Sequence, residues 1–479
     1  MTQTQQKPTS VQEAPAAKGG SEMPMLITMY LAAFLSAFNE NIINVALSDI
    51  MAAFSVSATT AQWLVSGFMI VTSLFTANMA FLSHRFSTRQ LLFTACGCLI
   101  VGEAICLVAP SFIVLLPARI IQAVGSGILL PLMMNTVLAC APLAQRGLFL
   151  AIGTACITLG PAFGPVISGF AVTLFGWRTI FVTPLVGGII VAILGAVFVH
   201  DFGERKDTQY DFVSLVLLAI GLTAFVYSVG EISSNFVLGL VVLVASIAVI
   251  LVFAARQLKL EEPVLNIRPM LSLRFWPACA LVVVAMMTTF SMSVLLPLYF
   301  EGAFGMTALM AGLLILPAIA VNALTSILAG RIMDARGPWP LLPLGFILIA
   351  IGQAAISLTA TGMNVVVIVL LTMVVYGGVG LVLSPSQNCG LATLSESEGP
   401  TGNALLNTWN MIAASFGPSL FIGLLSSGAA SAEAAGASEA LAQASGFASA
   451  VTVAAIIVVV GVVVAFFYAK REHTLRQAA

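Results

Sequence analysis

Apolar segments of about 20 residues recur along almost the whole chain, each long enough to cross the hydrocarbon core of a bilayer as a helix. The sequence is 60% hydrophobic and 8% charged, whereas an average soluble domain is about 25% charged. In lipid, a helix satisfies its own backbone hydrogen bonds. The alternating polarity of membrane β-strands is absent from the sequence. These features predict an all-α polytopic membrane protein.

Fourteen such segments can be distinguished, and the basic residues between them indicate their orientation. With the N-terminus in the cytoplasm, cytoplasmic loops and tails hold all but two of the 18 lysines and arginines, Arg119 and Arg178 being the exceptions. This distribution follows the positive-inside rule. It supports an even number of spans in the cell (inner) membrane and cytoplasmic termini. The expected spans are residues 26–50, 60–82, 90–110, 112–137, 147–173, 179–199, 212–230, 236–255, 276–299, 307–331, 340–360, 363–385, 402–426 and 446–469.

An internal repeat divides the chain into two parts. A short basic turn follows span two and another follows span ten, and a segment with Gly and Pro recurs in spans five and thirteen. This pairing predicts two six-helix bundles with an inserted helix pair between them, a 6 + 2 + 6 arrangement typical of transporters. The expected regions are a disordered cytoplasmic tail (1–24), the N-terminal bundle (25–200), the inserted pair with its cytoplasmic loops (201–275), the C-terminal bundle (276–470) and a cytoplasmic tail (471–479).

The first span carries an unusual polar stripe around the sequence FNENIINVAL. Ser36, Glu40, Asn44 and Ser48 recur at every fourth position and would share one face of a helix. A charged group in the middle of a bilayer costs about 3 kcal/mol or more, so Glu40 should face the bundle interior or a watery cavity. Glu40 is therefore a candidate proton carrier. The alternative is a neutral hydrogen bond that only holds helices together.

The fourth span contains a second charge, Arg119, with Gln122 one turn later on the same face. An arginine keeps its charge and needs a carboxylate, an anion or water nearby. Glu40 and Glu103, in span three, are the candidate partners, and Glu103 is also a candidate accessory carboxylate in proton coupling. The alternative for Arg119 is a side chain that extends to the outer interface.

Span five contains closely spaced glycine and proline residues, which permit a kink and close packing in a membrane helix. Such a helix could act as a hinge or a seal between the two bundles, although close packing alone would also explain the pattern. The residues concerned are Gly160, Pro161, Gly164, Pro165 and Gly169.

The basic turns on the cytoplasmic side are candidates for a gate. Arg331, Asp334 and Arg336 follow span ten, where one carboxylate between two guanidinium groups would form a charge latch. The corresponding turn after span two has Arg85 beside His84, so a latch there would be weaker. The alternative is that these charges only set the topology.

Several polar and aromatic residues inside the spans are candidates for the substrate pathway. Each of them alone is more often explained by packing than by binding. They are Asn39, Asn44, Gln62, Trp63, Gln122, Asn322, Asn407 and Trp409.

Other classes of function lack their signatures in this sequence. The net charge of −1 gives no indication of nucleic-acid binding. The 7 cysteines and 3 histidines show no metal-ligand spacing and no catalytic cluster at membrane depth. No P-loop motif is present, so ATP is not the expected energy source. We therefore expect no enzymatic activity, no metal and no cofactor, and transport driven by a gradient.

These segments resemble the major facilitator superfamily and, within it, the fourteen-helix drug:proton antiporters of the lincomycin-resistance type. The glycine- and proline-rich motif of span five is the most specific, because this motif is associated with exporters. Many relatives carry aspartate in place of Asn39, and the first basic turn usually has Asp and Gly in place of His84 and Ser87. The matching stretches are residues 39–47, 62–68, 160–169 and 330–337, together with Arg119, Gln122, Gly125 and Gly127.

The resemblance implies a monomeric exporter that exchanges protons for small amphipathic compounds by alternating access. Glu40 would be the main proton carrier, Arg119 would respond to its charge state, and Glu103 would be accessory. Carboxylates that face the pathway favour a cationic drug or toxic compound as cargo. The alternative on the same fold is export of an endogenous lipid, siderophore or metabolite.

Overall fold

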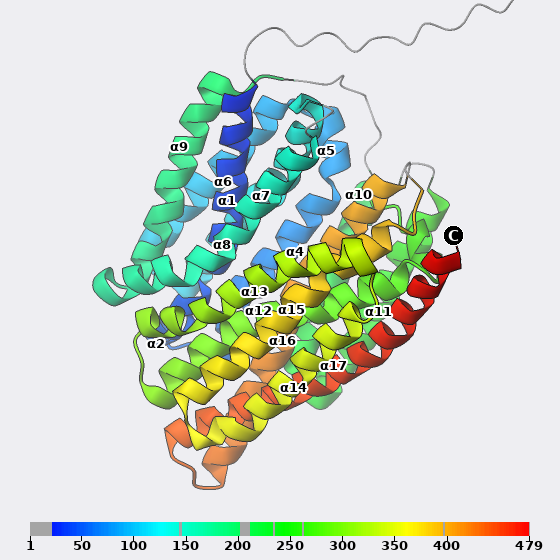
Figure 1. Cartoon of the computed structure of the whole chain (residues 1–479). Coiled ribbons are helices and arrows are strands. Elements are labelled where there is room, and N and C mark those ends of the chain that lie inside the picture. The colour runs from blue at the N-terminus through cyan, green and yellow to red at the C-terminus, as the bar shows by residue number, and fades with distance from the viewer. Residues whose placement is uncertain are drawn as a thin grey trace, which may run out of the picture.

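The computed structural model describes residues 22–142, 146–201, 211–232, 235–260, 263–395 and 398–478. Throughout these residues the regular structure is helical (Figure 1). Fourteen helical segments are long and apolar enough to cross a membrane, which confirms the predicted all-α polytopic class. The face at which α1 begins and α17 ends is called the terminal face below, and the other membrane surface is called the opposite face.

The elements follow one another without strands in the described ranges. The first half comprises α1 (Met23–Asn41), the 3₁₀ helix η1 (Asn44–Ala46), α2 (Leu47–Phe54), α3 (Ala58–Ala61), α4 (Trp63–Ala77), α5 (Met79–Arg85), α6 (Thr88–Val108), α7 (Phe112–Cys140), α8 (Arg146–Phe175), η3 (Trp177–Phe181) and α9 (Val182–Phe198). The inserted pair is α10 (Phe212–Glu231) and α11 (Phe236–Lys259), followed by η4 (Arg268–Leu271). The second half comprises α12 (Trp276–Phe304), α13 (Ala308–Arg336), α14 (Leu341–Thr359), η5 (Ala360–Gly362), α15 (Val365–Leu391), α16 (Gly399–Ala434) and α17 (Glu439–Ala478).

The two halves repeat one packing scheme. In the first half α1 packs on α8 and α9, α7 packs on α4 and α6, and α6 packs on α9. In the second half α12 packs on α16 and α17, α15 packs on α13 and α14, and α14 packs on α17. The halves meet through two further symmetric pairs, α4 with α16 and α8 with α13. The repeat seen in the sequence therefore corresponds to a repeat in space.

Two predicted spans are not continuous helices. The segment predicted at 26–50 breaks after Asn41 into α1, η1 and α2, and the segment predicted at 60–82 is divided among α3, α4 and α5. Asparagine side chains compete with the helical backbone for hydrogen bonds. Asn41 Nδ2 donates to the Ala37 carbonyl at 3.1 Å, and Asn78 Nδ2 donates to the Leu74 carbonyl at 2.7 Å, each beside a break.

The halves are hydrogen-bonded to each other near the opposite face. Ser66 Oγ donates to the Ser415 carbonyl at 3.0 Å, and Asn44 Nδ2 donates to Ser293 Oγ at 3.1 Å. Ser48 donates to the carboxylate of Glu301. Ser48 lies on α2, Glu301 near the end of α12 and Ser66 in the first turns of α4, all toward the opposite face, whereas Ser293 and Ser415 lie near the middle of their helices. The structure is therefore closed on that side, while the two halves diverge toward the terminal face (Figure 1).

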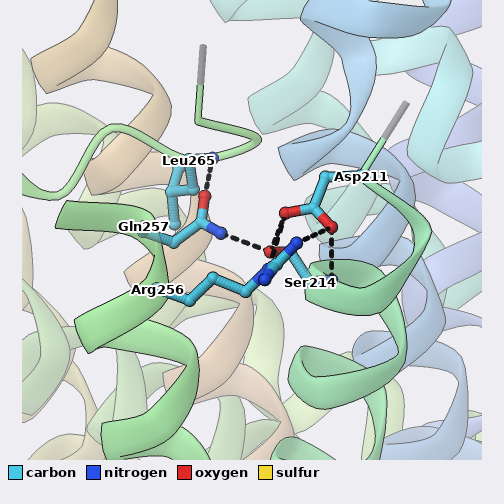
Figure 2. A network of polar contacts seen from close by, with 5 residues as sticks. All are labelled: Asp211, Ser214, Arg256, Gln257 and Leu265. Atoms are coloured by element: carbon cyan, nitrogen blue, oxygen red, sulfur yellow. Dashed lines mark hydrogen bonds and ion pairs between the residues drawn. The ribbon is translucent and has the colours of Figure 1, made fainter. Parts of the chain in front are cut away.

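The inserted pair packs against the seam between the halves, where α4 of the first half meets α16 of the second. Helix α10 packs against both α4 and α16, whereas α11 packs mainly against α10. At the terminal face a polar network holds the pair together (Figure 2). Arg256 donates from Nε and Nη2 to the two carboxylate oxygens of Asp211, each at 3.0 Å. Gln257 donates to Ser214 Oγ at 2.6 Å and accepts from the Leu265 amide at 3.0 Å, which fixes the loop after α11.

Candidate functional site

The break after Asn41 creates the first feature of the site. The last carbonyls of a helix have no partner within the helix, and the Asn39 carbonyl lies in this last turn. Arg119, on α7, donates hydrogen bonds to this free carbonyl. Its Nη1 and Nη2 donate to the Asn39 carbonyl at 3.3 and 3.4 Å, and Nη1 also donates to Asn39 Oδ1 at 3.0 Å. The polar segment of the first span therefore binds the arginine through its backbone as well as its side chain.

The other direct contacts of Arg119 are also with uncharged groups. Nη1 donates to Gln122 Oε1 at 2.7 Å, and the guanidinium carbon lies 4.2 Å from the centre of the Phe68 ring. The side chain is fully buried at 0% exposure, which excludes the alternative of an arginine that extends to the interface. Neutral amide oxygens accept the hydrogen bonds of Arg119 in this conformation, whereas the predicted partners Glu103 and Glu40 lie within electrostatic range without a direct ion pair among the described residues.

Glu103 contributes a second fully buried carboxyl group near this arginine. Both of its oxygens are inaccessible and form no hydrogen bond of normal geometry with the described residues, although the Asn39 side chain interacts with the carboxyl group. It lies within electrostatic range of Arg119, as does Glu40. One turn later on α6, Cys106 accepts a hydrogen bond from Gln122 Nε2 at 3.1 Å. The two predicted carboxylates and the arginine thus form one buried electrostatic cluster.

A cavity of about 320 Å³ lies between the halves, beside this cluster. Thr76, Met134, Leu383 and Asn407 belong to the parts of their helices nearer the terminal face, so the cavity extends toward that side. Its wall is mostly apolar. The polar and charged residues that line it are Glu40, Asn41, Thr76, Thr289, Ser293, Asn322, Tyr376, Asn407 and Asn410.

Glu40 is the one charged residue among those that line this cavity in the described part of the chain. It is 5% exposed and no hydrogen bond of its carboxyl group is seen with the described residues. The carboxyl group therefore joins the electrostatic cluster to the space between the halves. An organic cation or a proton that entered the cavity would meet this group.

The eight predicted pathway residues separate into four groups. Asn322 and Asn407 line the cavity, and Asn322 Nδ2 donates to the Tyr376 carbonyl at 3.0 Å. Asn39 and Gln122 hold Arg119 instead, and Asn44 belongs to the closed seam. The remaining three, Gln62, Trp63 and Trp409, lie outside the cavity wall, and the first two of them line a separate pocket.

The glycine and proline residues of α8 lie at two close helix contacts. A Cβ atom at Gly160 would come within 2.6 Å of the α1 backbone, and one at Gly169 would come within 2.7 Å of the Ala308 carbonyl on α13. Pro161 and Pro165 line the cavity, and Gly164 faces Asn41. Helix α8 therefore packs against both halves at the level of the cavity.

The predicted gate residues lie at the terminal face. Arg85 ends α5, and Arg331 and Arg336 lie exposed on the last turns of α13. The side chain of Asp334 falls outside the part of the chain that the structure describes, and the latch therefore stays a prediction.

Sequence reasoning missed the polar residues that close the opposite face. Glu301 accepts a hydrogen bond from Ser48, and Ser66 contacts Ser419 at 2.6 Å, each across the two halves. Ser48 belongs to the polar stripe of the first span, but the sequence does not indicate which residue it contacts. Glu301 stands near the end of an apolar run, where an acidic residue is usually explained by the membrane interface. No local pattern pairs residues that are about 250 or more positions apart, as these are.

The sequence matches the Major Facilitator Superfamily over residues 29–418. It is 31% identical over 421 residues to the lincomycin resistance protein LmrB of Bacillus subtilis (strain 168), which covers 87% of this chain and 88% of the relative. It is 25% identical over 402 residues to a multidrug resistance protein B homolog of Mycobacterium tuberculosis (strain CDC 1551 / Oshkosh), covering 82% of this chain and 74% of the relative.

Solved structures show the same fold. A bacterial homolog to the human lysosomal transporter Spinster, in an inward-facing and unoccupied conformation, superposes with a TM-score of 0.70 at 16% identity. The match covers 95% of this chain and 98% of that chain. A peptide transporter POT in complex with sulfate gives a TM-score of 0.66 at 13% identity, over 93% of this chain and 95% of that chain.

Proposed function

Because the chain belongs to the major facilitator superfamily, we propose that it is a proton-coupled antiporter that exports amphipathic cations by alternating access. One observation carries the proposal. Glu40 is a carboxyl group that lines the cavity between the halves and lies in electrostatic range of a fully buried arginine. The resistance functions named for the relatives support drugs or toxic compounds as the cargo class.

The coupling follows from competition at one carboxylate. In the present conformation the cavity extends toward the terminal face, which we propose is cytoplasmic. A cation that enters from there displaces the proton of Glu40, since the carboxylate can neutralise only one of them. After the halves rock and open the opposite face, an external proton displaces the cation. The proton has then moved inward and the cation outward.

Arg119 senses which partner Glu40 holds. Its hydrogen bonds to Asn39 and Gln122 involve neutral oxygens, so the guanidinium is not committed to a carboxylate in this state. An ionised Glu40 attracts the arginine, and a protonated Glu40 does not. Asn39 and Glu40 are adjacent at the end of α1, where the helix already breaks. A change in this attraction therefore acts on the junction between α1 and η1.

Helix α8 is the proposed seal between the halves. Its close contacts at Gly160 with α1 and at Gly169 with α13 leave no room for a side chain. Alternating access requires one half to rotate against the other around a site at mid-membrane. A smooth glycine surface lets α8 stay in contact while the halves rotate.

The charge balance of the exchange determines whether the pH difference or the membrane potential drives it. Exchange of one proton for one monovalent cation moves no net charge, so the pH difference alone drives it. Each pH unit supplies about 1.4 kcal/mol, which is a tenfold gradient. Exchange for a neutral compound would also use the membrane potential, at about 2.3 kcal/mol per 100 mV. Cation export should therefore respond to nigericin, which collapses the pH difference, more than to valinomycin.

The experiment that tests the proposal is proton-driven uptake of ethidium into inverted membrane vesicles. Wild type is compared with Glu40→Gln and with Glu439→Gln, a control carboxylate that is exposed at the start of α17. We expect Glu40→Gln to lose gradient-driven uptake by about 100-fold or more, in the range seen when a proton-transfer group is removed. Binding of ethidium to the purified variant should persist, and Glu439→Gln should transport as wild type does.

Two outcomes would contradict the proposal. If Glu40→Gln transports as well as wild type, Glu40 is structural and the coupling group must be sought at Glu103. If wild type moves no cation, drug export is excluded for the compounds tried, and export of an endogenous lipid, siderophore or metabolite becomes the leading function.

A further inference from the structure

A second pocket of about 280 Å³ lies near the opposite face, where α10 meets α3, α4 and α16. It shares no lining residue with the central cavity. The inserted pair supplies one wall through Tyr227 and Glu231, and the two halves supply the others through Gln62, Trp63 and Ser419. The pocket therefore exists only because α10 leans on the seam between the halves.

The chemistry of this pocket suits an organic cation. Glu231 is the one charged residue among the described residues that line it. The rings of Trp63 and Tyr227 have their centres 6.4 Å apart and are inclined by 32°. Aromatic rings attract cations through their electron-rich faces, and tryptophan does so most strongly. Two rings and a carboxylate around one pocket are complementary to an ammonium group in shape and in charge.

Gln62 provides an independent indication of a ligand. It is 3% exposed, and its Nε2 donates to Ser66 Oγ at 3.1 Å. Its Oε1 is buried and has no hydrogen-bond partner among the described residues. A buried acceptor without a partner is destabilising. A ligand with an N–H donor, or with polarised C–H groups beside an ammonium centre, would satisfy this oxygen.

An apolar groove continues from the pocket across the lipid-facing surface. Trp63 and Tyr227 belong to both, so the rings stand at the junction between them. The groove is lined further by Leu116, Ala219, Ile220 and Val242, none of which is charged. Ile220 is 53% exposed, so the groove faces the hydrocarbon chains of the bilayer.

We infer that the pocket and the groove together bind an organic cation with an apolar tail. The ammonium group would lie among Trp63, Tyr227 and Glu231, and the tail would lie along the groove. This deepens the proposed function and rests on it for one point, namely that the occupant is exported cargo on its way to the membrane leaflet at the opposite face. It also gives the inserted helix pair a role, since α10 carries two of the three binding side chains.

The pocket also adjoins the closed seam. Ser66 accepts from Gln62, donates to the Ser415 carbonyl at 3.0 Å and contacts Ser419 Oγ at 2.6 Å. Ser419 lines the pocket itself. A ligand bound to Gln62 Oε1 would therefore lie beside the hydrogen bonds that keep the opposite face shut.

The test is quenching of tryptophan fluorescence in phosphatidylcholine nanodiscs by N-dodecylpyridinium, whose cationic head group is itself the quencher. We expect saturable quenching in wild type. Trp63→Phe should lose the saturable part, because it removes the fluorophore and keeps a ring. Glu231→Gln and Tyr227→Leu should each raise the Kd by about tenfold, which corresponds to about 1.4 kcal/mol. Glu433→Gln, an exposed carboxylate at the same face, is the matched control and should leave the Kd unchanged.

Neutral and lipid probes separate the alternatives. The uncharged 12-bromododecanol should quench without saturation. Brominated phosphatidylethanolamine, which carries its own ammonium group, should quench Trp63 weakly and be displaced by the cation. The inference is overturned if the cation does not saturate, if the control variant and Glu231→Gln behave alike, or if the lipid binds and the cation cannot displace it.

Failure of this inference can be distinguished from failure of the proposed function. Ethidium uptake that persists without saturable quenching of Trp63 rejects the second site alone. Saturable quenching in a protein that transports no cation rejects the export function and leaves the site as a membrane-facing cation site. Size-exclusion elution of each variant, together with its ethidium uptake, establishes that the variant is folded.

Discussion

Arg119 and Arg256 are held by opposite kinds of hydrogen-bond acceptor. Arg256 binds both oxygens of Asp211 at 3.0 Å, and its side chain is 41% exposed at the membrane surface. Arg119 is 0% exposed, and its acceptors are the neutral oxygens of Asn39 and Gln122. The better-solvated arginine thus has the carboxylate, and the fully buried one does not.

This difference indicates that Arg256 has a structural role, whereas Arg119 is able to respond to nearby carboxyl groups. A two-point pair with a carboxylate holds Arg256 in a single geometry, as Figure 2 shows, and ties α10 to α11. A buried cation held by amides keeps its charge available to carboxylates that lie within electrostatic range, as Glu40 and Glu103 do. An ion pair already formed at Arg119 could not respond to the proton of Glu40.

The largest effect should come from replacing Arg119 itself. Arg119→Lys keeps the charge, but one ammonium group cannot serve Asn39 and Gln122 together or stack on Phe68 as the planar guanidinium does. We expect proton-driven ethidium uptake to fall by about 30-fold or more, which corresponds to about 2 kcal/mol. Arg256→Lys is the matched control and should transport within about twofold of wild type. Equal losses in the two variants would show that the two sites do not differ in the way proposed.

The position of Arg119 also marks the limit of what the sequence predicts. Its pairing with Gln122 follows from helical spacing, and its burial follows from its place in an apolar span. Its hydrogen bonds to the Asn39 carbonyl do not, because this carbonyl is free only where α1 breaks. The apolar run continues across that break, so its hydrophobicity predicts one long helix. The competing asparagines were visible in the sequence, but their effect on the helix was not.

Local sequence patterns predict the membrane-spanning helices better than they predict which helices pack against one another. The fourteen spans and the symmetry between spans two and ten, and between spans five and thirteen, all follow from composition and motifs. The position of the inserted pair against α4 and α16 depends on helix packing and has no sequence signal. The sequence predicts Gln62 and Trp63 as pathway residues, and in the structure they line the pocket beside α10 and not the central cavity.

An intermediate effect is expected at Glu103, which shares the buried cluster but does not line the cavity. Glu103→Gln removes a titratable carboxyl group within electrostatic range of Arg119 and leaves the cavity wall intact. We expect the maximal rate of ethidium uptake to fall by about fivefold, or about 1 kcal/mol, with no change in the KM. Cys96→Ala, a buried change on the same helix, is the control. A complete loss in Glu103→Gln beside an active Glu40→Gln would exchange the roles of the two carboxyl groups.

The smallest effect should follow from breaking the Arg256 pair. The hydrogen bonds from Arg256 lower the pKa of Asp211 to about 2, below the usual value of 3.8. A carboxylate with a lowered pKa stabilises the fold above the unfolded pKa, and this stabilisation is lost as the pH falls from about 4 to about 2. Because Arg256 is exposed and solvent screens the pair, the contribution to stability should be small.

Asp211→Asn should therefore lower the thermal midpoint by only a few degrees at pH 7 and leave ethidium uptake unchanged. Its midpoint should also depend less on pH than that of wild type between pH 4 and 2. Differential scanning fluorimetry across this range measures both quantities. A loss of coupled transport in Asp211→Asn would mean that the inserted pair takes part in the coupling. Arg256 and Arg119 would then both contribute to transport, and would differ only in the size of their effects.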